Sequence, residues 1–419
     1  MLYALHELQR DAMKPVAAWS QVMSNALTHP FNPWASNPAT AANTKRLAAG
    51  YDLINRLGKD YEKPQWLLDS TQIDGKSVPV FIDTVEAKPF CKLLHFRRDT
   101  DKNTAKKLSQ ATVLLVAPMS GHHATLLRDT VRTLIADHDV YVTDWVDARM
   151  VPVEAGNFSL DDYVNYIMGF IRRLGPDVHV ISVCQPTVPV LAAISLLATL
   201  KDPACPRSMT MMGGPIDPRA SPTAVNTLAT TKPFRWFKDT VIYTVPLNYP
   251  GAGRRVYPGF LQYSGFIAMN PDRHLSAHWD YFMDLVKGDE QDVDAHRKFY
   301  DEYNAVLDLD ADFYLDTIKT IFQEHRLPKG TWDVMVDGAL VRVNPADIKK
   351  TALLTIEGEL DDISGSGQTR AAQGLCSGVA AKNKQHFEAP NCGHYGIFSG
   401  RRWRDVIYPQ VKGFIAKNA

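Results

Sequence analysis

The stretch DVHVISVCQPTVPVLAAISLLATL, residues 177–200, decides the fold of this chain. Its first part, DVHVISV, is apolar and rich in β-branched residues and predicts a buried strand, and the part from Gln185 to Leu200 predicts a helix. Cys184 lies where the strand meets the helix. A tight turn at such a junction, the nucleophile elbow, strains its central residue and projects that side chain outward, with G-x-S-x-G as its usual sequence. Cys184 is therefore either a buried core residue or a nucleophile on this turn.

The five residues around Cys184 lack both glycines of the usual elbow, but they permit the turn. Ser182 is small enough for the position two residues before the nucleophile. Pro186 falls in the first helical turn, where its missing N–H costs nothing. Gln185 keeps a backbone N–H for an oxyanion hole. The partial positive charge of a helix N-terminus favours a thiolate. Since an isolated cysteine is more often buried and inert, the rest of the chain must decide.

Strand-like and helical segments alternate on both sides of this stretch. The run ATVLLVAP (111–118) is continuously apolar, which is typical of a strand covered on both faces. SLDDYVNYIMGFIRRLG (159–175) predicts an amphipathic helix with Ser159 as its N-cap. Earlier, SVPVFIDTV and CKLLHFRR predict two antiparallel strands. The alternation predicts an α/β fold whose mostly parallel central sheet is wrapped by helices.

Four segments follow from this pattern: an N-terminal helical and loop segment over 1–75, the first part of the α/β core over 76–216, an insertion over 217–348, and the second part of the core over 349–419. The insertion breaks the strand–helix alternation, is rich in aromatic residues and has recurring helical patterns. We expect it to be a largely helical lid over the site, because ligands of α/β sheets bind beyond the carboxyl ends of the strands.

The N-terminal segment begins with an apolar stripe. Leu2, Leu5, Leu8 and Met13 roughly follow helical spacing. Such a stripe either docks on a hydrophobic surface or packs on its own domain, and we expect the second.

An acid and a histidine follow Cys184 in the order nucleophile, acid, histidine that accompanies the elbow. Asp361 comes just after the predicted strand ALLTIEGEL, ahead of Asp362, although a helix N-cap would also explain it. His394 lies in APNCGHYGIF, after the last predicted strand, between two glycines that leave room for an imidazole. Cys392 lacks a strand-to-helix turn and is interpreted as structural. The joint order of Cys184, Asp361 and His394 predicts a catalytic triad.

A second oxyanion-hole donor is expected from the loop after the strand 111–118. In PMSGHH we expect the Ser120 backbone amide to serve, with Met119 or Gly121 as its neighbours. His122 and His123 are interpreted as structural.

Composition excludes several classes of protein. The 419 residues carry 46 Lys+Arg and 46 Asp+Glu, so no basic footprint for nucleic acid exists. Five scattered cysteines without a C-x-x-C pair indicate neither a zinc site nor a disulfide framework, and we expect no cofactor and no metal. Neither a signal peptide nor a run of 18 apolar residues is evident, so we expect a cytoplasmic protein without a membrane span.

Several long motifs together resemble one family. PMSGHHATLLRDTV, VTDWVDARMVP, VCQPTVPVLAA, MMGGPIDPR, EGELDDISGSGQT and NCGHYGIFSGRRW are similar to motifs of the intracellular poly(3-hydroxyalkanoate) depolymerases. The resemblance runs from about residue 75 to the end of the chain. It places the family's nucleophile on Cys184, its aspartate on Asp361 and its histidine on His394.

This resemblance implies an α/β-hydrolase fold and an enzyme that acts in the cytoplasm at the surface of storage granules, with amorphous poly(3-hydroxybutyrate) as substrate. A cysteine nucleophile forms a thioester acyl-enzyme, and we expect water as the acceptor, with coenzyme A as an alternative that the sequence does not exclude. Residues 322–348 also resemble the polyester synthases, so a synthase-like acyltransferase is an alternative. A non-enzymatic granule-coat protein is a second alternative, but it would not need an ordered triad. Oligomeric state does not follow from the sequence.

Overall fold

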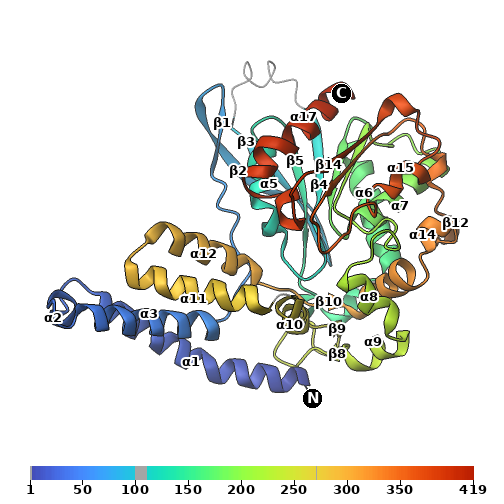
Figure 1. Cartoon of the computed structure of the whole chain (residues 1–419). Coiled ribbons are helices and arrows are strands. Elements are labelled where there is room, and N and C mark those ends of the chain that lie inside the picture. Colours follow the sequence, from blue (N-terminus) through green and yellow to red (C-terminus); the bar gives the residue numbers. More distant parts are fainter. Residues whose placement is uncertain (1, 100–110, 270) are drawn as a thin grey trace.

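A central nine-stranded sheet organises the chain in the computed structural model, which describes residues 2–99, 111–269 and 271–419 (Figure 1). The strands lie in the order β1-β2-β3-β5-β4-β6-β7-β13-β14. The pairs from β5 to β14 are parallel, and β1, β2, β3 and β5 pair antiparallel at one side. This mostly parallel sheet confirms the predicted fold class, and its order with β5 before β4 is that of the α/β-hydrolase fold.

The strands of this sheet have the following bounds: β1 Ser70–Ile73, β2 Lys76–Lys88, β3 Cys91–Arg98, β4 Thr112–Val116, β5 Asp139–Trp145, β6 His179–Val183, β7 Ser208–Met212, β13 Ala352–Gly358 and β14 Lys384–Ala389. A three-stranded sheet contains β8 Tyr243–Thr244, β9 Arg255–Tyr257 and β10 Leu309–Asp310. A two-stranded sheet contains β11 Asp333–Val336 and β12 Ala339–Arg342.

The α-helices have the following bounds: α1 Leu2–Thr28, α2 Pro33–Ser36, α3 Ala41–Gly58, α5 Arg128–Leu134, α6 Leu160–Leu174, α7 Thr187–Thr199, α8 Ala224–Thr231, α9 Phe234–Thr240, α10 Gly259–Met269, α11 Pro271–Lys287, α12 Glu290–Tyr303, α13 Ala311–Thr317, α14 Arg326–Lys329, α15 Ala371–Leu375, α16 Gly400–Arg402 and α17 Tyr408–Lys417.

The central strands of the sheet are covered on both faces, so their side chains are buried from solvent. Every residue of β6, β7 and β13 is buried. This explains why these strands read as continuous apolar runs rather than as an alternation. Figure 1 shows α5 and α17 on one face of the sheet and α6 and α7 on the other.

Helix α6 begins and ends where the sequence predicts. The Ser159 side chain accepts from the Asp162 backbone N–H, and the Asp162 side chain accepts from the Ser159 backbone N–H. Gly175 follows with φ of 86°, a conformation that favours glycine. These contacts satisfy N–H groups that a helix start otherwise leaves free.

The segment 217–348 contains more than helices. It holds α8 to α14 together with the short strands β8 to β12. The recurring helical patterns of the insertion predict helices near 274–287 and 292–306, and these correspond to α11 and α12. Figure 1 shows that α11 and α12 lie beside α1 and α3, and these four helices form an arm that extends sideways from the body of the molecule.

The expectation that the N-terminal apolar stripe packs on its own domain is wrong for most of its members. Leu5 and Leu8 are 58% and 68% exposed, and Leu2 and Met13 also reach solvent. The buried side of α1 carries Tyr3, Ala17 and Leu27 together with the polar Glu7, Ser20 and Ser24. The spacing located the helix correctly but placed its apolar stripe in the interior. In the structure most of the charged side chains of α1 face inward instead, where Asp60 and Tyr249 bind them.

Candidate active site

Cys184 lies on a strained turn between β6 and α7. Its φ is +69°, in the left-handed region that non-glycine residues rarely adopt. The Cys184 N–H donates to the Met212 carbonyl over 2.7 Å, and the Cys184 carbonyl accepts from the Thr187 N–H over 3.1 Å. Ser182 is fully buried, and the helix begins directly after Pro186. The turn has the geometry of a nucleophile elbow, in which the strain exposes the central side chain.

Two glycines after β7 make room for this turn. A Cβ added to Gly214 would lie 1.8 Å from the Thr187 Oγ1 atom and 2.4 Å from the Cys184 carbonyl oxygen. Gly213 has φ of +56°, and a Cβ on it would lie 3.4 Å from both the Asp361 Oδ2 and the His394 Cε1 atoms. The turn at Cys184 lacks the two glycines of the usual elbow. Gly213 and Gly214, directly after β7, give it the room that those glycines would have given. The double glycine in MMGGPI was the available signal for this role.

Asp361 and His394 come together beyond the ends of β13 and β14. The His394 Nδ1 atom and the Asp361 Oδ2 atom are 2.8 Å apart, and both side chains are buried. The other carboxylate oxygen, Oδ1, accepts from the backbone N–H groups of Ile363 and Ser364 over 2.9 and 2.8 Å. Asp362, by contrast, is exposed. The neighbouring amides hold the Asp361 carboxylate in one orientation toward the imidazole.

The electrostatic surroundings of His394 favour its protonated form. Burial alone lowers the pKa of the imidazole, whereas the charges of Cys184 and Asp361 and hydrogen bonds to both side chains raise it. The net result is a His394 pKa well above the ordinary value. The structure therefore brings Cys184, His394 and Asp361 into one chain of interactions, with His394 in the middle.

The two expected oxyanion-hole donors emerge at the same edge of the sheet as Cys184. Strands β4 and β6 are parallel neighbours with Val116 beside Ser182, so the Ser120 loop and the elbow leave the sheet together. In the part of the chain that the structure describes, the backbone N–H groups of Ser120 and Gln185 have no intramolecular acceptor. Backbone donors of this kind are what an oxyanion hole requires.

Helix α10 covers the Ser120 loop. A Cβ added to Gly121 would lie 2.7 Å from the Gln262 Oε1 atom and 3.2 Å from the Phe266 ring. Phe266 also stacks on His122, with ring centroids 4.9 Å apart. The segment 217–348 therefore reaches the loop next to the elbow, through residues that the sequence did not single out.

The other candidate cysteine and histidines have structural surroundings. Cys392 is buried, and burial raises the pKa of its thiol. Burial lowers the pKa of His122 to about 4 and that of His123 to about 3, which keeps both imidazoles neutral. The His122 Nε2 atom lies 3.2 Å from the Tyr303 carbonyl oxygen, where a neutral N–H can donate.

Sequence reasoning missed the aromatic side chains around His394. Tyr395 and Phe398 lie edge-on to the imidazole, with ring centroids 5.9 and 5.8 Å away. Both belong to HYGIF, so the motif carried the signal. These rings exclude water from one side of the site and thereby strengthen the interaction between His394 and Asp361.

No group of three or more His, Cys, Asp or Glu side chains able to hold a metal ion occurs within residues 2–99, 111–269 and 271–419. Over the same residues, the structure contains no helix with the length and apolar character needed to cross a bilayer.

Two solved structures are distantly similar to this chain. A monoacylglycerol lipase from Paleococcus ferrophilus is 15% identical over 74% of this chain and 95% of its own, with a TM-score of 0.44. A meta-cleavage product hydrolase from Pseudomonas fluorescens is 16% identical over 84% and 98%, with a TM-score of 0.42. No curated protein matches the chain. The fold assignment rests on the strand order and the turn at Cys184 rather than on these likenesses.

One family matches in sequence. The family described as PHB de-polymerase C-terminus covers residues 213–419, which include Gly213, Gly214, Asp361 and His394. This range contains the segment after β7, the acid loop and the histidine loop. The chain belongs to the PHB depolymerase family and is an ester hydrolase.

Proposed function

We propose that this enzyme cleaves the ester bonds of amorphous poly(3-hydroxybutyrate) in cytoplasmic storage granules, with Cys184 as nucleophile, His394 as base and acid, and Asp361 as the group that orients His394. The left-handed conformation of Cys184 at the end of β6, within reach of His394, is the observation that carries this proposal. A side chain held this way projects toward a substrate rather than into the core.

The first half of the reaction forms a thioester. His394 takes the proton of the Cys184 thiol, and the raised pKa of His394 favours that transfer. The thiolate attacks the ester carbonyl, and the backbone N–H groups of Gln185 and Ser120 stabilise the oxyanion. The C–O bond then breaks, His394 returns the proton to the leaving alcohol oxygen, and a 3-hydroxyacyl group remains on Cys184.

The second half releases the acid. His394 takes a proton from water, the hydroxide attacks the thioester carbonyl, and the C–S bond breaks with return of the proton to the sulfur. Asp361 keeps the Nδ1 proton in place through the 2.8 Å contact, so that Nε2 serves the reaction. Coenzyme A is an alternative acceptor in place of water.

We also propose that residues 217–348 act as a lid that guides an apolar polymer chain to Cys184. The contact of Gln262 and Phe266 with Gly121 supports this, because it lies one residue from the Ser120 amide. Aromatic rings offer flat apolar contact to the methyl and ester groups of a polyester. Other aromatic residues of the segment, among them Phe237, pack in its own core with Ala229, Leu315 and Ile318.

Replacing Cys184 tests the proposed function. Cys184→Ala should lower release of 3-hydroxybutyrate from amorphous polymer by several orders of magnitude, because it removes the group that is proposed to form the acyl-enzyme. Cys392→Ala is the matched control and should keep most of the activity, since its thiol is buried and does not lie on a strand-to-helix turn. The reverse result would place the nucleophile at Cys392. Product analysis with and without coenzyme A identifies the acceptor.

A further inference from the structure

The arm turns its apolar residues outward. On α1, the exposed face contains Leu5, Leu8, Val16, Trp19 and Val22. The exposed Ala12 lies between Leu8 and Val16, so apolar side chains follow one another three or four residues apart along this face. Leu8, Trp19 and Val22 are 68%, 54% and 62% exposed. From Leu5 to Val22 this stripe runs about 26 Å along the helix. Contiguous exposed apolar surface of such length marks an interaction site rather than an ordinary protein surface.

Glu7, Arg10 and Lys14 of α1 lie on the opposite side of the helix and are paired there. Arg10 and Lys14 pair with Asp60 over 3.3 and 2.9 Å, and Glu7 accepts from Arg10 and from Tyr249. Asp11, the remaining charged residue of α1, accepts from Lys14 over 2.9 Å. This distribution is the inverse of a helix that covers a core, where the polar side faces water.

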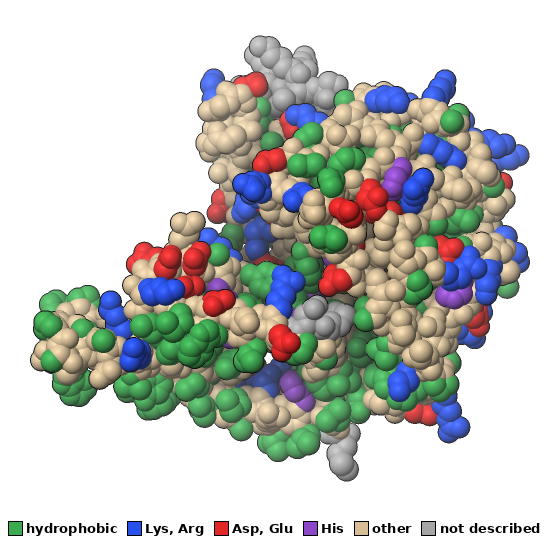
Figure 2. Space-filling model, viewed as in Figure 1, with side chains coloured by type: hydrophobic (Ala, Val, Ile, Leu, Met, Phe, Trp, Pro, Cys, Tyr) green, Lys and Arg blue, Asp and Glu red, His purple; other side chains and the backbone are tan. Residues whose placement is uncertain are grey.

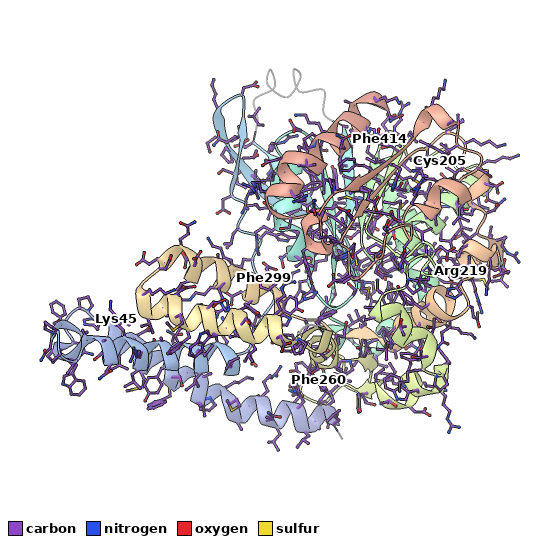
Figure 3. The ribbon with its side chains drawn as sticks, viewed as in Figure 1. Lys45, Cys205, Arg219, Phe260, Phe299 and Phe414 are labelled. Carbon is purple, nitrogen blue, oxygen red and sulfur yellow. The ribbon has the colours of Figure 1, made fainter. Side chains whose placement is uncertain are left out.

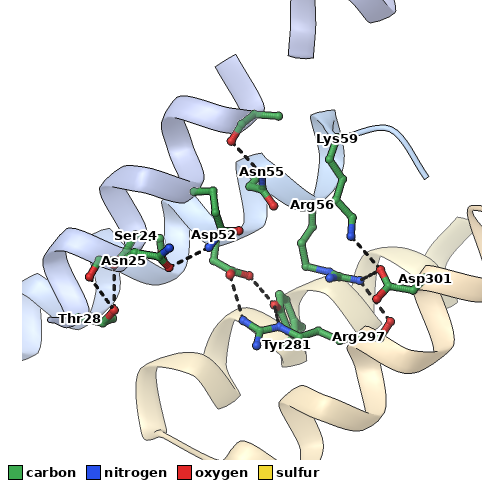
Figure 4. A network of polar contacts seen from close by, with 12 residues as sticks. Ser24, Asn25, Thr28, Asp52, Asn55, Arg56, Lys59, Tyr281, Arg297 and Asp301 are labelled. Carbon is green, nitrogen blue, oxygen red and sulfur yellow. Dashed lines mark hydrogen bonds and ion pairs between the residues drawn. The ribbon is translucent and has the colours of Figure 1, made fainter. Parts of the chain in front are cut away.

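Polar contacts also hold the inner side of the arm together (Figure 4). Asp52 of α3 pairs with Arg297 of α12 over 3.0 Å and accepts from Tyr281 of α11. Arg56 and Lys59 both lie 3.0 Å from Asp301. The arm therefore does not need its outer apolar residues for its own packing, which leaves them free for a partner.

The apolar face continues from α1 onto α3 and the tip of the arm. Trp19 meets Tyr51 edge-on with ring centroids 5.3 Å apart, and Leu47 and Ile54, one turn before and after Tyr51, are exposed. Phe31, between α1 and α2, is 89% exposed. Figure 2 shows hydrophobic side chains gathered at the end of the arm and along its lower edge.

Helix α1 of the arm contacts helix α10, which lies next to the candidate active site. His6 stacks on Phe260 of α10 with ring centroids 4.0 Å apart, and Tyr3 lies 5.5 Å from the same ring. Figure 3 shows Phe260 where the arm joins the body and Lys45 at the far end of the arm. Since α10 also carries Phe266 beside the Ser120 loop, a surface bound by the arm would lie next to the helix that covers the site.

We infer that the exposed face of α1 and α3, here the docking face, binds the surface of the amorphous polyester particle; this rests on the proposed function. A helix that binds an anionic bilayer exposes Lys and Arg along its polar side. Both cations of α1 are paired within the protein, and α3 exposes Lys45 and Arg46 near its start, at the far end of the arm. A protein partner would need about one hydrogen bond per 100–200 Å² of interface, and the stripe from Leu5 to Val22 contains apolar side chains at its central positions. A neutral apolar polymer surface fits this chemistry.

Substitution of the docking face with uncharged polar residues tests the inference. Leu5→Gln, Leu8→Gln and Val22→Gln, combined, should weaken co-sedimentation with amorphous poly(3-hydroxybutyrate) particles about tenfold or more. Polymer cleavage should fall at least about tenfold further than cleavage of a soluble 3-hydroxybutyrate ester, because the soluble ester does not need the arm. Met335→Gln with Leu340→Gln, also on exposed side chains but on the β11–β12 hairpin, is the matched control and should bind as the wild type does.

Three outcomes would overturn the inference. The triple variant binding polymer particles like the wild type excludes the docking face. A wild-type dimer that the triple variant converts to a monomer, with unchanged particle binding, identifies a self-association interface instead. Equal binding of the wild type to phosphatidylcholine vesicles and to polymer identifies a general apolar surface. Failure of the proposed function looks different, since the wild type would then bind particles without cleaving them.

A second measurement does not depend on the stability of the variant. Leu8→Cys, labelled with an environment-sensitive fluorophore, should shift its emission to shorter wavelength on addition of polymer particles, relative to the labelled wild-type protein. The same label at Leu340→Cys should not shift. Equal shifts at both positions, or none at Leu8→Cys, would contradict docking through α1.

Discussion

At the scale of single residues, the choice between two adjacent carboxylates is decided by the surroundings of the first. Asp361 is buried, contacts His394 and accepts two backbone N–H groups, whereas Asp362 is exposed. Asp361→Asn should lower kcat about 10³–10⁴-fold with little change in KM, because an amide favours the wrong imidazole tautomer. Asp362→Asn is the matched control and should keep near wild-type turnover. A larger loss at position 362, measured with a soluble ester, would reverse the assignment.

Gly214 offers a second test at this scale. Gly214→Ala places a methyl group where the Thr187 hydroxyl and the Cys184 carbonyl now lie. We expect the elbow to shift, with more than about tenfold loss of kcat and a loss of stability of about 1–3 kcal/mol from overpacking. Gly374→Ala, in helix α15 with open space around it, should be neutral or slightly stabilising. Equal activity of the two variants would show that the close approach at Gly214 does not shape the site.

At the scale of elements, α10 is the part of the lid that meets the active-site loop. Phe266→Ala removes the ring that stacks on His122 and contacts Gly121. Polymer hydrolysis should fall severalfold more than hydrolysis of a small activated ester, because a long chain needs the apolar wall and a small ester does not. Phe81→Ala on strand β2, also partly exposed, is the control. Equal losses on both substrates in a folded Phe266→Ala protein would argue against a guiding role for α10.

At the scale of the whole molecule, buried neutral histidines make stability depend on pH. Burial lowers the pKa of His138 to about 4, and neither of its ring nitrogens has a partner within the described residues. Because this pKa lies below the ordinary 6.5, the unfolded chain binds more protons between these two pH values. The contribution of the neutral His138 to the free energy of unfolding is therefore fully present above about pH 6.5 and is lost as the pH falls toward 4.

His138→Leu should remove this part of the pH dependence. Between pH 8 and pH 5 the wild type should lose about 2 kcal/mol more in free energy of unfolding than the variant does. At pH 5 the imidazole is protonated in the unfolded chain but still mostly neutral in the folded protein, and this difference sets the size of the loss. Urea unfolding at the two pH values measures the difference. His29→Leu, an exposed histidine near the tip of the arm, is the control and should follow the wild type. A variant with the same pH dependence as the wild type would contradict a neutral buried His138.

The sequence by itself determined the α/β class, the junction at Cys184 and the order in which acid and histidine follow it. These are local properties: continuous apolar runs mark strands buried on both faces, and turn residues mark their ends. The bounds of α6 followed for the same reason, since Ser159 and Asp162 cap the helix through contacts within one turn.

Only the tertiary structure decided which residues make the elbow possible and which way the arm faces. Gly214 makes room for Cys184 from the loop directly after the adjacent strand β7, and no local sequence pattern contains this contact. The outward direction of Leu5 and Leu8 depends on Asp60 and Tyr249, which hold the charged side of α1 from other segments. Periodicity shows that a helix has two sides, but the side that is buried depends on the partners that folding brings to it.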